Sequence, residues 1–498
     1  MATELVDVTT VPITSTAENL ERVARDTRVF VSMPYIRGIT PKVLVETGCH
    51  EVSASGAAVE LCSGVFRLDE IGLPALDHGL LYGDAVFEGI LLSHGRLFQW
   101  REHLNRLYTS AEHLQIKIPY TAAELTRHIL ELEDHVPSPD TGVGYLRLVA
   151  TRGIGDLGIN PAHCAGGTIY AIASKLQLYP ESFYQQGLHV ALARQIRRPG
   201  AETLDPRLKT CNYLNNVLAL LETSGQETQE TLMLSQSGFV AEATTDNIFL
   251  VVRSPGWEED PSKVTISTPV ANYCLKGITR ALVLGRAKAL GFRVVESSVM
   301  VPSDFVGEDR EVFLTGTAAG IVPVVLVDGQ VVDHGLPGPI THRLRELLNE
   351  DLANPAMGLE LDADDERIVS YLADTPCKQQ AAPMSADFVR SMFNTIDSRD
   401  WDGLEELFCE NMIYERPGYE PLVGYRRVHK FYREERVIAS GTHILDGIVV
   451  NGDRGACWGR FVGLHKNGSA IDEGFADAYT FRDGKVETRK SYFFRPAV

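Results

Sequence analysis

The stretch that organises this chain runs from Arg207 to Leu221 and reads RLKTCNYLNNVLALL. Its only lysine, Lys209, follows a polar, proline-containing segment and precedes Tyr213 and an apolar run at helical spacing. A lone lysine in such a setting is most often a surface charge. Here, four further segments each carry a group that suits one part of a phosphorylated aldehyde. We therefore interpret Lys209 as a candidate Schiff-base lysine.

The size and charge of the chain limit its class. Its 498 residues are too many for one hydrophobic core and predict about three domains. The net charge of −19 argues against nucleic acid or an anionic membrane as the main partner. No apolar stretch reaches the roughly 18–20 residues that span a bilayer, and the N-terminus carries no export signal. We expect a cytoplasmic protein that acts on small molecules.

The cysteines indicate a reduced protein without a bound metal. There is no CxxC pair and no metal-ligand spacing, and a scattered pattern of this kind favours free thiols over a disulfide framework. The eight cysteines are residues 49, 62, 164, 211, 274, 377, 409 and 457.

The order of the predicted elements indicates a multidomain chain of α+β and α/β character. A polar run near residues 178–186 separates two lobes, and the last segment has helices followed by long alternating strands with hairpin turns at Asn467-Gly468 and Asp483-Gly484. Residues 15–27 and 367–372 predict isolated helices. The expected segments are an N-terminal extension (1–60), a small lobe (61–178), a larger lobe (179–351), a linker (352–385) and an α+β cone (386–498).

Two arginines stand out in otherwise apolar segments. Residues 101–114, REHLNRLYTSAEHL, predict an amphipathic helix in which Arg106 lies off the apolar stripe, one turn after Glu102. Arg106 either forms a surface ion pair with Glu102 or binds a phosphate, and periodicity alone favours the ion pair. Arg147 lies inside an apolar strand, so it needs a partner or a water-filled cleft.

Pyridoxal phosphate chemistry requires a small set of groups, and the chain has a candidate for each. A lysine forms the imine, a carboxylate keeps the ring nitrogen protonated, and a hydroxyl contacts the phenolic oxygen; Lys209, Glu242 and Tyr213 suit these roles. The phosphate needs a cation, hydroxyls and backbone amides. Its candidates are Arg106, the helix start Gly277-Ile278-Thr279, and Gly316-Thr317.

Together these segments resemble the class IV (fold-type IV) PLP-dependent aminotransferases, most of all the branched-chain group. The matching stretches over residues 64–350 are LDHGLLYGDAVFEG, HLNRLYTSA, YLRLVATRGIGDLG, DPRLKTCNYLNN, AEATTDNIF, LKGITR and LTGTAAGIVPV. The resemblance implies a two-lobed transaminase that moves an amino group between an amino acid and a 2-oxo acid. It would work through an internal aldimine on Lys209, as a homodimer or larger homo-oligomer.

The resemblance also implies a role for each matched position. Glu242 would pair with the pyridinium nitrogen, Tyr213 would contact the phenolic oxygen, and Leu275 would pack on the ring. The phosphate would be held by Arg106, Gly277, Ile278, Thr279 and Thr317. The substrate would meet the amides of Ala318 and Ala319 and the side chains of Tyr82, Phe87, Tyr145 and Arg147.

The family leaves one alternative reaction and shows three departures. A lyase of the aminodeoxychorismate type uses the same fold, although FEG and GDLG favour the aminotransferase. An inactive scaffold is disfavoured because the cofactor set is intact. Ala85, Leu91 and Leu92 differ from the common family pattern, and we expect them beside the substrate. The identity of the amino donor therefore stays open.

The segment 386–498 resembles the SnoaL-like, nuclear transport factor-like and ketosteroid isomerase-like cones. The resemblance rests on YERPGYEPLVG, GTHILDG, WGRFVG and FADAYTFRDGKVETRKSYF. Such a domain either binds or converts a small molecule or serves only for dimerisation. Its fusion to a transaminase favours specialised-metabolite biosynthesis. We expect His443 and Asp477 to form a proton-transfer pair, and the other candidate pocket residues are Tyr414, Arg416, Arg460 and Asp472.

Overall fold

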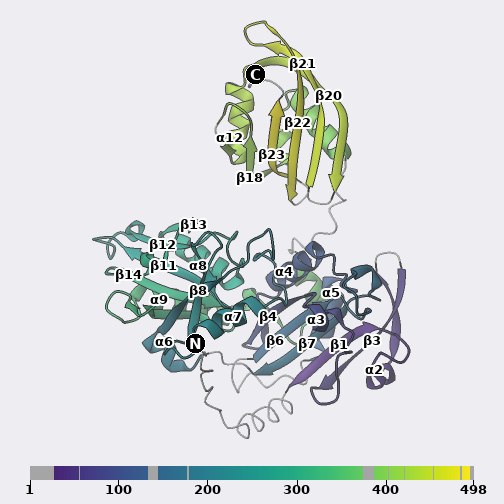
Figure 1. Ribbon diagram of the computed structural model, residues 1–498, viewed down its shortest axis with the longest axis vertical. Coiled ribbons are helices and arrows are strands. Elements are labelled where there is room, and N and C mark those ends of the chain that lie inside the picture. Colours follow the sequence, from purple (N-terminus) through teal and green to yellow (C-terminus); the bar gives the residue numbers. More distant parts are fainter. Residues whose placement is uncertain are drawn as a thin grey trace, which may run out of the picture. The chain divides into compact units, whose positions relative to one another are not determined.

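The structure is a computed structural model. It describes residues 27–54, 57–132, 144–175, 179–373, 386–401, 403–419, 421–451, 454–482 and 485–493. The chain forms two compact units, Met1–Thr375 and Pro376–Val498 (Figure 1). The helix expected over residues 15–27 lies outside the described residues, apart from Thr27. In the part that the structure describes, no helix is long and apolar enough to cross a membrane.

The small lobe of the first unit is an antiparallel eight-stranded sheet whose core lies under two amphipathic helices. Leu104 and Leu107 of one helix and Leu125 of the other pack in the same core as Ile90 and Leu146 of the sheet. In sheet order the strands are β17 (Gly358–Glu360), β5 (Arg96–Phe98), β4 (Ala85–Ser93), β6 (Gly144–Thr151), β7 (Thr168–Lys175), β1 (Arg28–Pro34), β3 (Ala57–Arg67) and β2 (Cys49–Ala54). The helices are α2 (Lys42–Thr47), α3 (His78–Tyr82), α4 (Trp100–His113), α5 (Ala122–Leu130) and α10 (Asp365–Ala373), with short turns η3 (Pro161–His163) and η6 (Pro355–Met357).

The structure places parts of the expected extension and linker inside this sheet. Strand β1 comes from the expected extension, and it is buried between β3 and β7 because its sequence is almost wholly apolar. Strand β17 comes from the expected linker and pairs with β5. The helix predicted over residues 367–372 is confirmed as α10, and it is tied to α4 because Arg101 Nε donates to the carbonyl of Tyr371 at 2.9 Å.

The prediction of free thiols is wrong for one pair, because Cys49 and Cys62 form a disulfide. The two residues lie directly opposite each other on β2 and β3, with Cα atoms 4.1 Å apart. Strand register brings them together, and their spacing in the sequence does not reveal it. Cys377 lies outside the described residues. The cysteines that form no disulfide in the described part of the chain are Cys164, Cys211, Cys274, Cys409 and Cys457.

The large lobe is a mixed nine-stranded sheet. Asn247, at the start of one strand, lies opposite Thr315, near the end of the neighbouring strand. The turn from Gly316 to Gly320 follows directly after Thr315. In sheet order the strands are β10 (Val240–Ala243), β9 (Glu230–Leu234), β8 (Leu188–Arg197), β15 (Gly320–Val327), β14 (Arg310–Gly316), β11 (Asn247–Arg253), β12 (Val264–Pro269) and β13 (Arg293–Ser297), with β16 (Gln330–Val331) on β15. The helices are α6 (Glu181–Gln186), α7 (Leu214–Glu222), α8 (Ile278–Ala289) and α9 (Pro339–Ala353), with turns η4 (Pro261–Lys263) and η5 (Pro302–Phe305).

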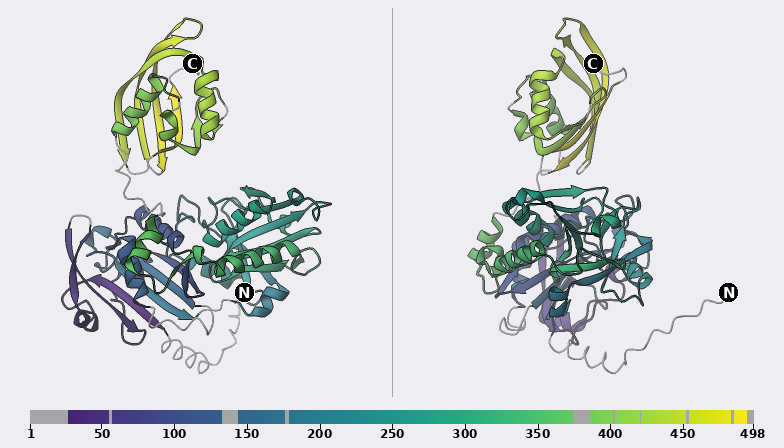
Figure 2. Two further views of the ribbon diagram at one scale, coloured as in Figure 1. Left: turned by 180° about the vertical axis from the view of Figure 1, so that it is seen from behind. Right: turned by 90° about the vertical axis from the view of Figure 1, so that its left-hand side faces the viewer.

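The second unit is a curved six-stranded sheet with its helices on one face, as expected for a cone (Figure 2). Phe393, Phe431 and Phe475 form part of its core. The expected Asn467-Gly468 turn is present, whereas Asp483-Gly484 lies outside the described residues. In sheet order the strands are β19 (Leu422–Val423), β18 (Phe408–Glu415), β23 (Lys485–Phe493), β22 (Ala470–Arg482), β21 (Arg454–His465) and β20 (Ile438–Asn451). The helices are α11 (Ala386–Asp397) and α12 (Tyr425–Lys430), with turns η7 (Gly403–Glu406) and η8 (Phe431–Glu435).

Candidate active site

The stretch around Lys209 pairs with β4, so a segment of the large lobe lies directly against the small lobe. The amide of Phe87 donates to the carbonyl of Lys209 at 3.0 Å, and the amide of Cys211 donates to the carbonyl of Ala85 at 2.9 Å. The side chain of Lys209 places Nζ 4.6 Å from the centre of the Phe87 ring. The ring of Tyr213 meets the same Phe87 ring edge-on at 5.4 Å. Three of the predicted residues therefore meet at one place.

Glu242 is buried in the large lobe and is held by three donors. Arg198 Nε donates to one carboxylate oxygen at 2.6 Å, and the amide of Leu275 donates to the other at 3.0 Å. Asn247 Nδ2 lies 3.3 Å from the same second oxygen and also donates to the carbonyl of Leu275. This arrangement fixes the carboxylate and links it to the segment before α8.

Arg106 is ion-paired with Glu88 of β4 rather than with Glu102, so the sequence-based preference for a surface ion pair is wrong. Arg106 Nε and Nη2 each lie 2.7 Å from a Glu88 oxygen, and Nη1 donates to the carbonyl of Lys276. His103 Nδ1 lies 2.7 Å from Glu88 as well. Burial alone would raise the pKa of Glu88, but Arg106 and His103 outweigh burial and lower it to about 2.

Two backbone segments near this group are shaped by glycine. Gly277 precedes α8, whose start has no side-chain cap, and a Cβ there would lie 2.1 Å from Asn247 Oδ1. A Cβ on Gly316 would lie 1.9 Å from Asp246 Oδ1. The side chain of Asn247 therefore packs directly on the start of α8, and that of Asp246 packs on the turn that contains Thr317. Burial raises the pKa of Asp246 to about 7, and the charge of Lys209 opposes that rise.

The charge of Lys209 also affects the pKa of His103 in the small lobe. Burial lowers the pKa of His103, the bonded carboxylate of Glu88 opposes that fall, and the charges of Arg106 and Lys209 lower the pKa. The lysine amine therefore lies within electrostatic range of both His103 and Asp246.

The expected substrate residues lie on one face of β4 and β6. Gly89 is opposite Arg147 and Leu91 is opposite Tyr145, so these side chains share the Phe87 face of the sheet. Arg147 stacks on Phe87 with Cζ 4.5 Å from the ring centre, and its buried Nε has no hydrogen-bond partner in the described part of the chain. An unpartnered guanidinium nitrogen on this face suits an incoming anion.

The remaining expected substrate residues lie on several different elements. Tyr82 is 38% exposed on α3, where its hydroxyl donates to the carbonyl of Leu157 and its ring meets His78. Leu92 belongs to the small-lobe core and Leu91 to the core beneath α8 and α9. Ala85 is buried beside Phe87, and Ala319 is buried in the Gly316 turn next to Ala318.

The second unit has a cavity that opens to solvent, and the empty space between its walls and in its mouth is about 490 Å³. Both His443 and Asp477 line it, but they are not paired as expected. His443 Nδ1 lies 2.5 Å from Asp397, at the end of α11, while Asp477 accepts from Arg489 Nε at 2.8 Å and from Tyr479 at 2.9 Å. The lining residues are Tyr414, Arg416, Tyr432, Arg436, Ile438, His443, Phe461, Ile471, Glu473, Phe475, Asp477, Arg489 and Phe493.

Two other expected pocket residues lie outside the cavity. Arg460 and Asp472 form an ion pair across β21 and β22, and their side chains are 59% and 52% exposed. Their alternation along the strands points them away from the core.

Comparisons with known proteins agree with this arrangement. The family described as amino-transferase class IV matches residues 85–327, and the SnoaL-like domain matches residues 389–488. A putative branched-chain-amino-acid aminotransferase of Methanocaldococcus jannaschii is 40% identical over 270 residues, which cover 54% of this chain and 88% of that protein. The chain belongs to the class IV aminotransferase family.

Further relatives show the breadth of that family. A D-alanine aminotransferase of Bacillus licheniformis is 30% identical over 277 residues, covering 55% of this chain and 90% of that protein. The crystal structure of a thermophile branched-chain amino acid aminotransferase with pyridoxamine 5'-phosphate has a TM-score of 0.52 at 29% identity, covering 62% of this chain and 96% of that one. The first unit is thus a PLP-dependent class IV aminotransferase, and a SnoaL-like domain follows it.

Several residues of the aminotransferase site were not found from the sequence. Glu88 holds Arg106 and is itself bonded to His103, and Arg198 and Asn247 hold Glu242. The one available signal was that Glu88 stands within an otherwise apolar strand, which implies a buried partner. The positions of the others depend on contacts between segments distant in the sequence.

Proposed function

We propose that the class IV aminotransferase unit moves an amino group between an amino acid and a 2-oxo acid, with Lys209 as the residue that bonds to the cofactor aldehyde. The observation that carries this proposal is the placement of Lys209. Its backbone is bonded to β4, and its Nζ faces the Phe87 ring at 4.6 Å. Its charge reaches His103 in the small lobe and Asp246 in the large lobe.

The residues present fit pyridoxal phosphate. The first-turn amides of α8 have no side-chain cap, and a helix start of this kind attracts a phosphate. Arg106 lies beside that helix start, because its Nη1 donates to the carbonyl of Lys276 at 3.0 Å. We assign the phosphate to Arg106, Gly277, Ile278, Thr279 and Thr317.

Other residues near Lys209 suit the ring of the cofactor. Pyridoxal phosphate, when bound, supplies an aldehyde and an electron-accepting ring. Glu242 would accept a hydrogen bond from the protonated ring nitrogen, and its pairing with Arg198 at 2.6 Å fixes its oxygens for that role. Tyr213 would contact the phenolic oxygen, and Leu275 would pack on the ring.

Lys209 would then act on the substrate as an acid and a base. Its amine would take the proton from the substrate α-carbon and deliver it to the neighbouring carbon of the cofactor. Arg147 and Tyr145 would face the substrate together with Phe87, because they share one face of the sheet. The amides of Ala318 and Ala319, in the turn after β14, would meet the substrate carboxylate.

One relative is named for branched-chain amino acids and another for D-alanine. Because both kinds of donor have an apolar side chain, we propose small apolar amino acids as the donor class. The aromatic rings of Phe87 and Tyr145 support an apolar side chain in the pocket. A lyase remains the alternative reaction of this site. A panel of L- and D-amino acids assayed with several 2-oxo acids separates these outcomes, because a lyase yields a product without consuming an amino acceptor.

We also propose that the aminotransferase unit is a homodimer. Leu80, Leu81 and Tyr82 of α3 are exposed, as are Leu214 and Leu221 of α7. Asn212 Nδ2 donates to the carbonyl of Gly83, which places the start of α7 beside the end of α3. A patch of large apolar side chains of this kind is typical of a protein interface. Light scattering would show twice the mass of the chain.

For the SnoaL-like domain we propose that its cavity binds or further converts a small molecule. The cavity, which is lined by aromatic rings and buried charged groups, supports this function over a role in dimerisation alone. A truncated chain that ends before residue 386 would distinguish ligand binding or conversion from dimerisation alone. Unchanged products with a smaller assembly favour dimerisation, whereas a changed product favours a catalytic or binding domain.

The central test is Lys209→Ala. Purified protein given pyridoxal phosphate should show the visible absorption band that the cofactor gains when it is joined to a lysine, and the variant should lack it. Lys263→Ala, on an exposed turn, is the matched control and should keep the band. A band that persists in Lys209→Ala would contradict the assignment.

A further inference from the structure

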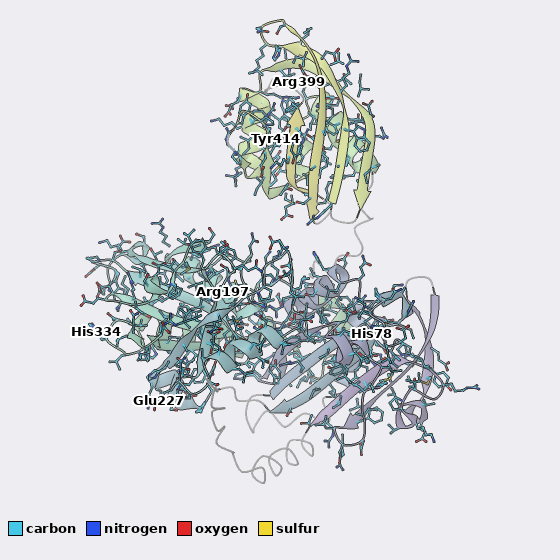
Figure 3. All side chains as sticks on the ribbon, viewed as in Figure 1. His78, Arg197, Glu227, His334, Arg399 and Tyr414 are labelled. Atoms are coloured by element: carbon cyan, nitrogen blue, oxygen red, sulfur yellow. A yellow bond between two sulfur atoms is a disulfide. The ribbon has the colours of Figure 1, made fainter. Side chains whose placement is uncertain are left out.

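The cavity of the SnoaL-like domain contains more basic than acidic side chains. Its lining includes three arginines, Arg416, Arg436 and Arg489, and two carboxylates, Glu473 and Asp477. Tyr414, which lies on β18 and is labelled in Figure 3, adds a hydroxyl at the same wall. One net positive charge therefore remains when all five groups are ionised.

One of the arginines is neutralised within the protein. Arg489 is 4% exposed and lies 2.6 Å from Asp477. Its Nη1 also donates to the hydroxyl of Tyr432 at 2.7 Å. Asp477 therefore neutralises the charge of Arg489.

Arg436 is different because its charge has no counterion among the described residues. It is 9% exposed, and its buried Nε lacks a partner there. In the described part of the chain its contacts are with aromatic rings, with Cζ 5.4 Å from the Tyr432 ring centre and 5.7 Å from that of Phe461. A buried and unpaired guanidinium is unfavourable, so an anion that enters the cavity would be stabilised there.

The remaining lining residues indicate which chemical group the rest of such a ligand carries. Phe461, Phe475 and Phe493 line the cavity together with Ile438 and Ile471. Flat aromatic and branched aliphatic side chains of this kind favour an apolar or aromatic group.

His443 adds a polar ring to the wall of the cavity. Its Nδ1 is bonded to Asp397 at 2.5 Å, its backbone amide donates to the same carboxylate at 2.7 Å, and its ring lies 4.7 Å from the Phe461 ring. The bond to Asp397 leaves Nε2 as the ring nitrogen for a ligand. Burial lowers the pKa of His443, and the bond to Asp397 opposes that fall.

We propose that this cavity binds a small monocarboxylate with an apolar or aromatic body, with its carboxylate on Arg436 and its body among the phenylalanines. This rests on the proposed function, that the cavity is a ligand site. The class includes the 2-oxo acids that a transaminase consumes and releases. The guanidinium of Arg436, which has no counterion among the described residues, favours a monoanion over a phosphate dianion.

The test is calorimetric titration of the full-length, cofactor-loaded protein with a matched pair, 3-phenylpropionate and 3-phenylpropionamide. Neither has an amino group or an α-keto group, so neither is converted at the aminotransferase site. Binding of the acid at that site is common to the wild type and the Arg436 variants, so binding to the cavity is measured as the difference between them. The variants are Arg436→Met and Arg436→Lys, and the control is Arg460→Met, an exposed arginine of the same sheet. Arg436 variants report on the cavity alone, because the aminotransferase site keeps its own arginines. Phenyl phosphate is titrated as the competing anion.

We expect the acid to bind at least tenfold more tightly than the amide, Arg436→Met to lose that binding, Arg436→Lys to keep part of it, and Arg460→Met to behave as wild type. Equal binding of acid and amide, or undiminished binding to Arg436→Met, would overturn the carboxylate assignment and leave the cavity as a ligand site. Tighter binding of phenyl phosphate would overturn the preference for a monoanion. If neither the pair nor a panel of neutral aromatic compounds binds, the proposed function of the cavity fails as well.

Discussion

Replacing Glu88 tests how Arg106 is positioned in the aminotransferase unit. The Glu88 side chain is buried and bonded to Arg106 and His103 at 2.7 Å. These partners hold its folded-state pKa at about 2, against 4.5 for an isolated glutamate. At about 1.4 kcal/mol per pH unit, the difference is worth about 3 kcal/mol. We expect Glu88→Gln to lower the free energy of unfolding at pH 7 by about 3 kcal/mol, and to weaken binding of pyridoxal phosphate because Arg106 loses its partner.

The contribution of Glu88 to the free energy of unfolding depends on pH in a defined direction. Because the folded pKa is depressed, the stabilisation from Glu88 is complete above about pH 4.5 and is lost as the pH falls toward about 2. Urea unfolding of both proteins at several pH values from 7 to 3, followed by tryptophan fluorescence, measures the difference. Glu102→Gln, on the same helix, is the control and should change stability by less than about 0.5 kcal/mol. A constant difference between Glu88→Gln and wild type across this range, or none at pH 7, would refute the reasoning.

Three further predictions concern other parts of the aminotransferase unit. Gly89→Ala should lower kcat/KM by about 10- to 100-fold, because the added Cβ would lie 1.9 Å from the Tyr145 hydroxyl and must displace it from the substrate face. Cys62→Ser should lower the free energy of unfolding by about 3 kcal/mol in thermal melts, since the lost disulfide closes a loop over a sequence separation of 13. Asp246→Asn should gain stability relative to wild type as the pH rises from 3.8 to about 7, because a carboxyl with a raised pKa destabilises the folded state across that range.

Controls for these variants are available in the same chain. Gly285→Ala, in helix α8 with open space at its Cβ, should leave activity unchanged and stabilise the helix by up to about 1 kcal/mol. Cys164→Ser changes a cysteine that forms no disulfide in the described part of the chain, and it should not move the melting temperature in the way that Cys62→Ser does. An Asp246→Asn protein whose stability relative to wild type is flat across this range would show that the carboxyl does not titrate there.

The family and the set of cofactor candidates could be predicted from the sequence. A local motif carries its own geometry: the uncapped start of α8 at Gly277 and the small-residue turn at Gly316 lie where the pattern placed them. Helical spacing likewise identified α4, and the capping box of Thr121 and Glu124 is present in α5. These features depend on residues within one or two turns of each other, so a short stretch of sequence contains them.

The partners of the site residues could not be predicted in this way. The choice of Glu88 over Glu102 for Arg106 and the bond from Arg198 to Glu242 depend on how separate segments meet. The choice of Asp397 over Asp477 for His443 depends on the packing of α11 against β20. Strand register decided the disulfide between Cys49 and Cys62 as well.

The difference follows from the range of the interactions. Lys209 could be singled out by its own neighbours and by the order of the motifs along the chain. What surrounds its amine was decided only by tertiary structure, because the pairing of residues 207–211 with β4 brings groups from both lobes around it. In the SnoaL-like domain the same rule left Arg436 unnoticed, since only folding shows that its charge is buried without a counterion among the described residues.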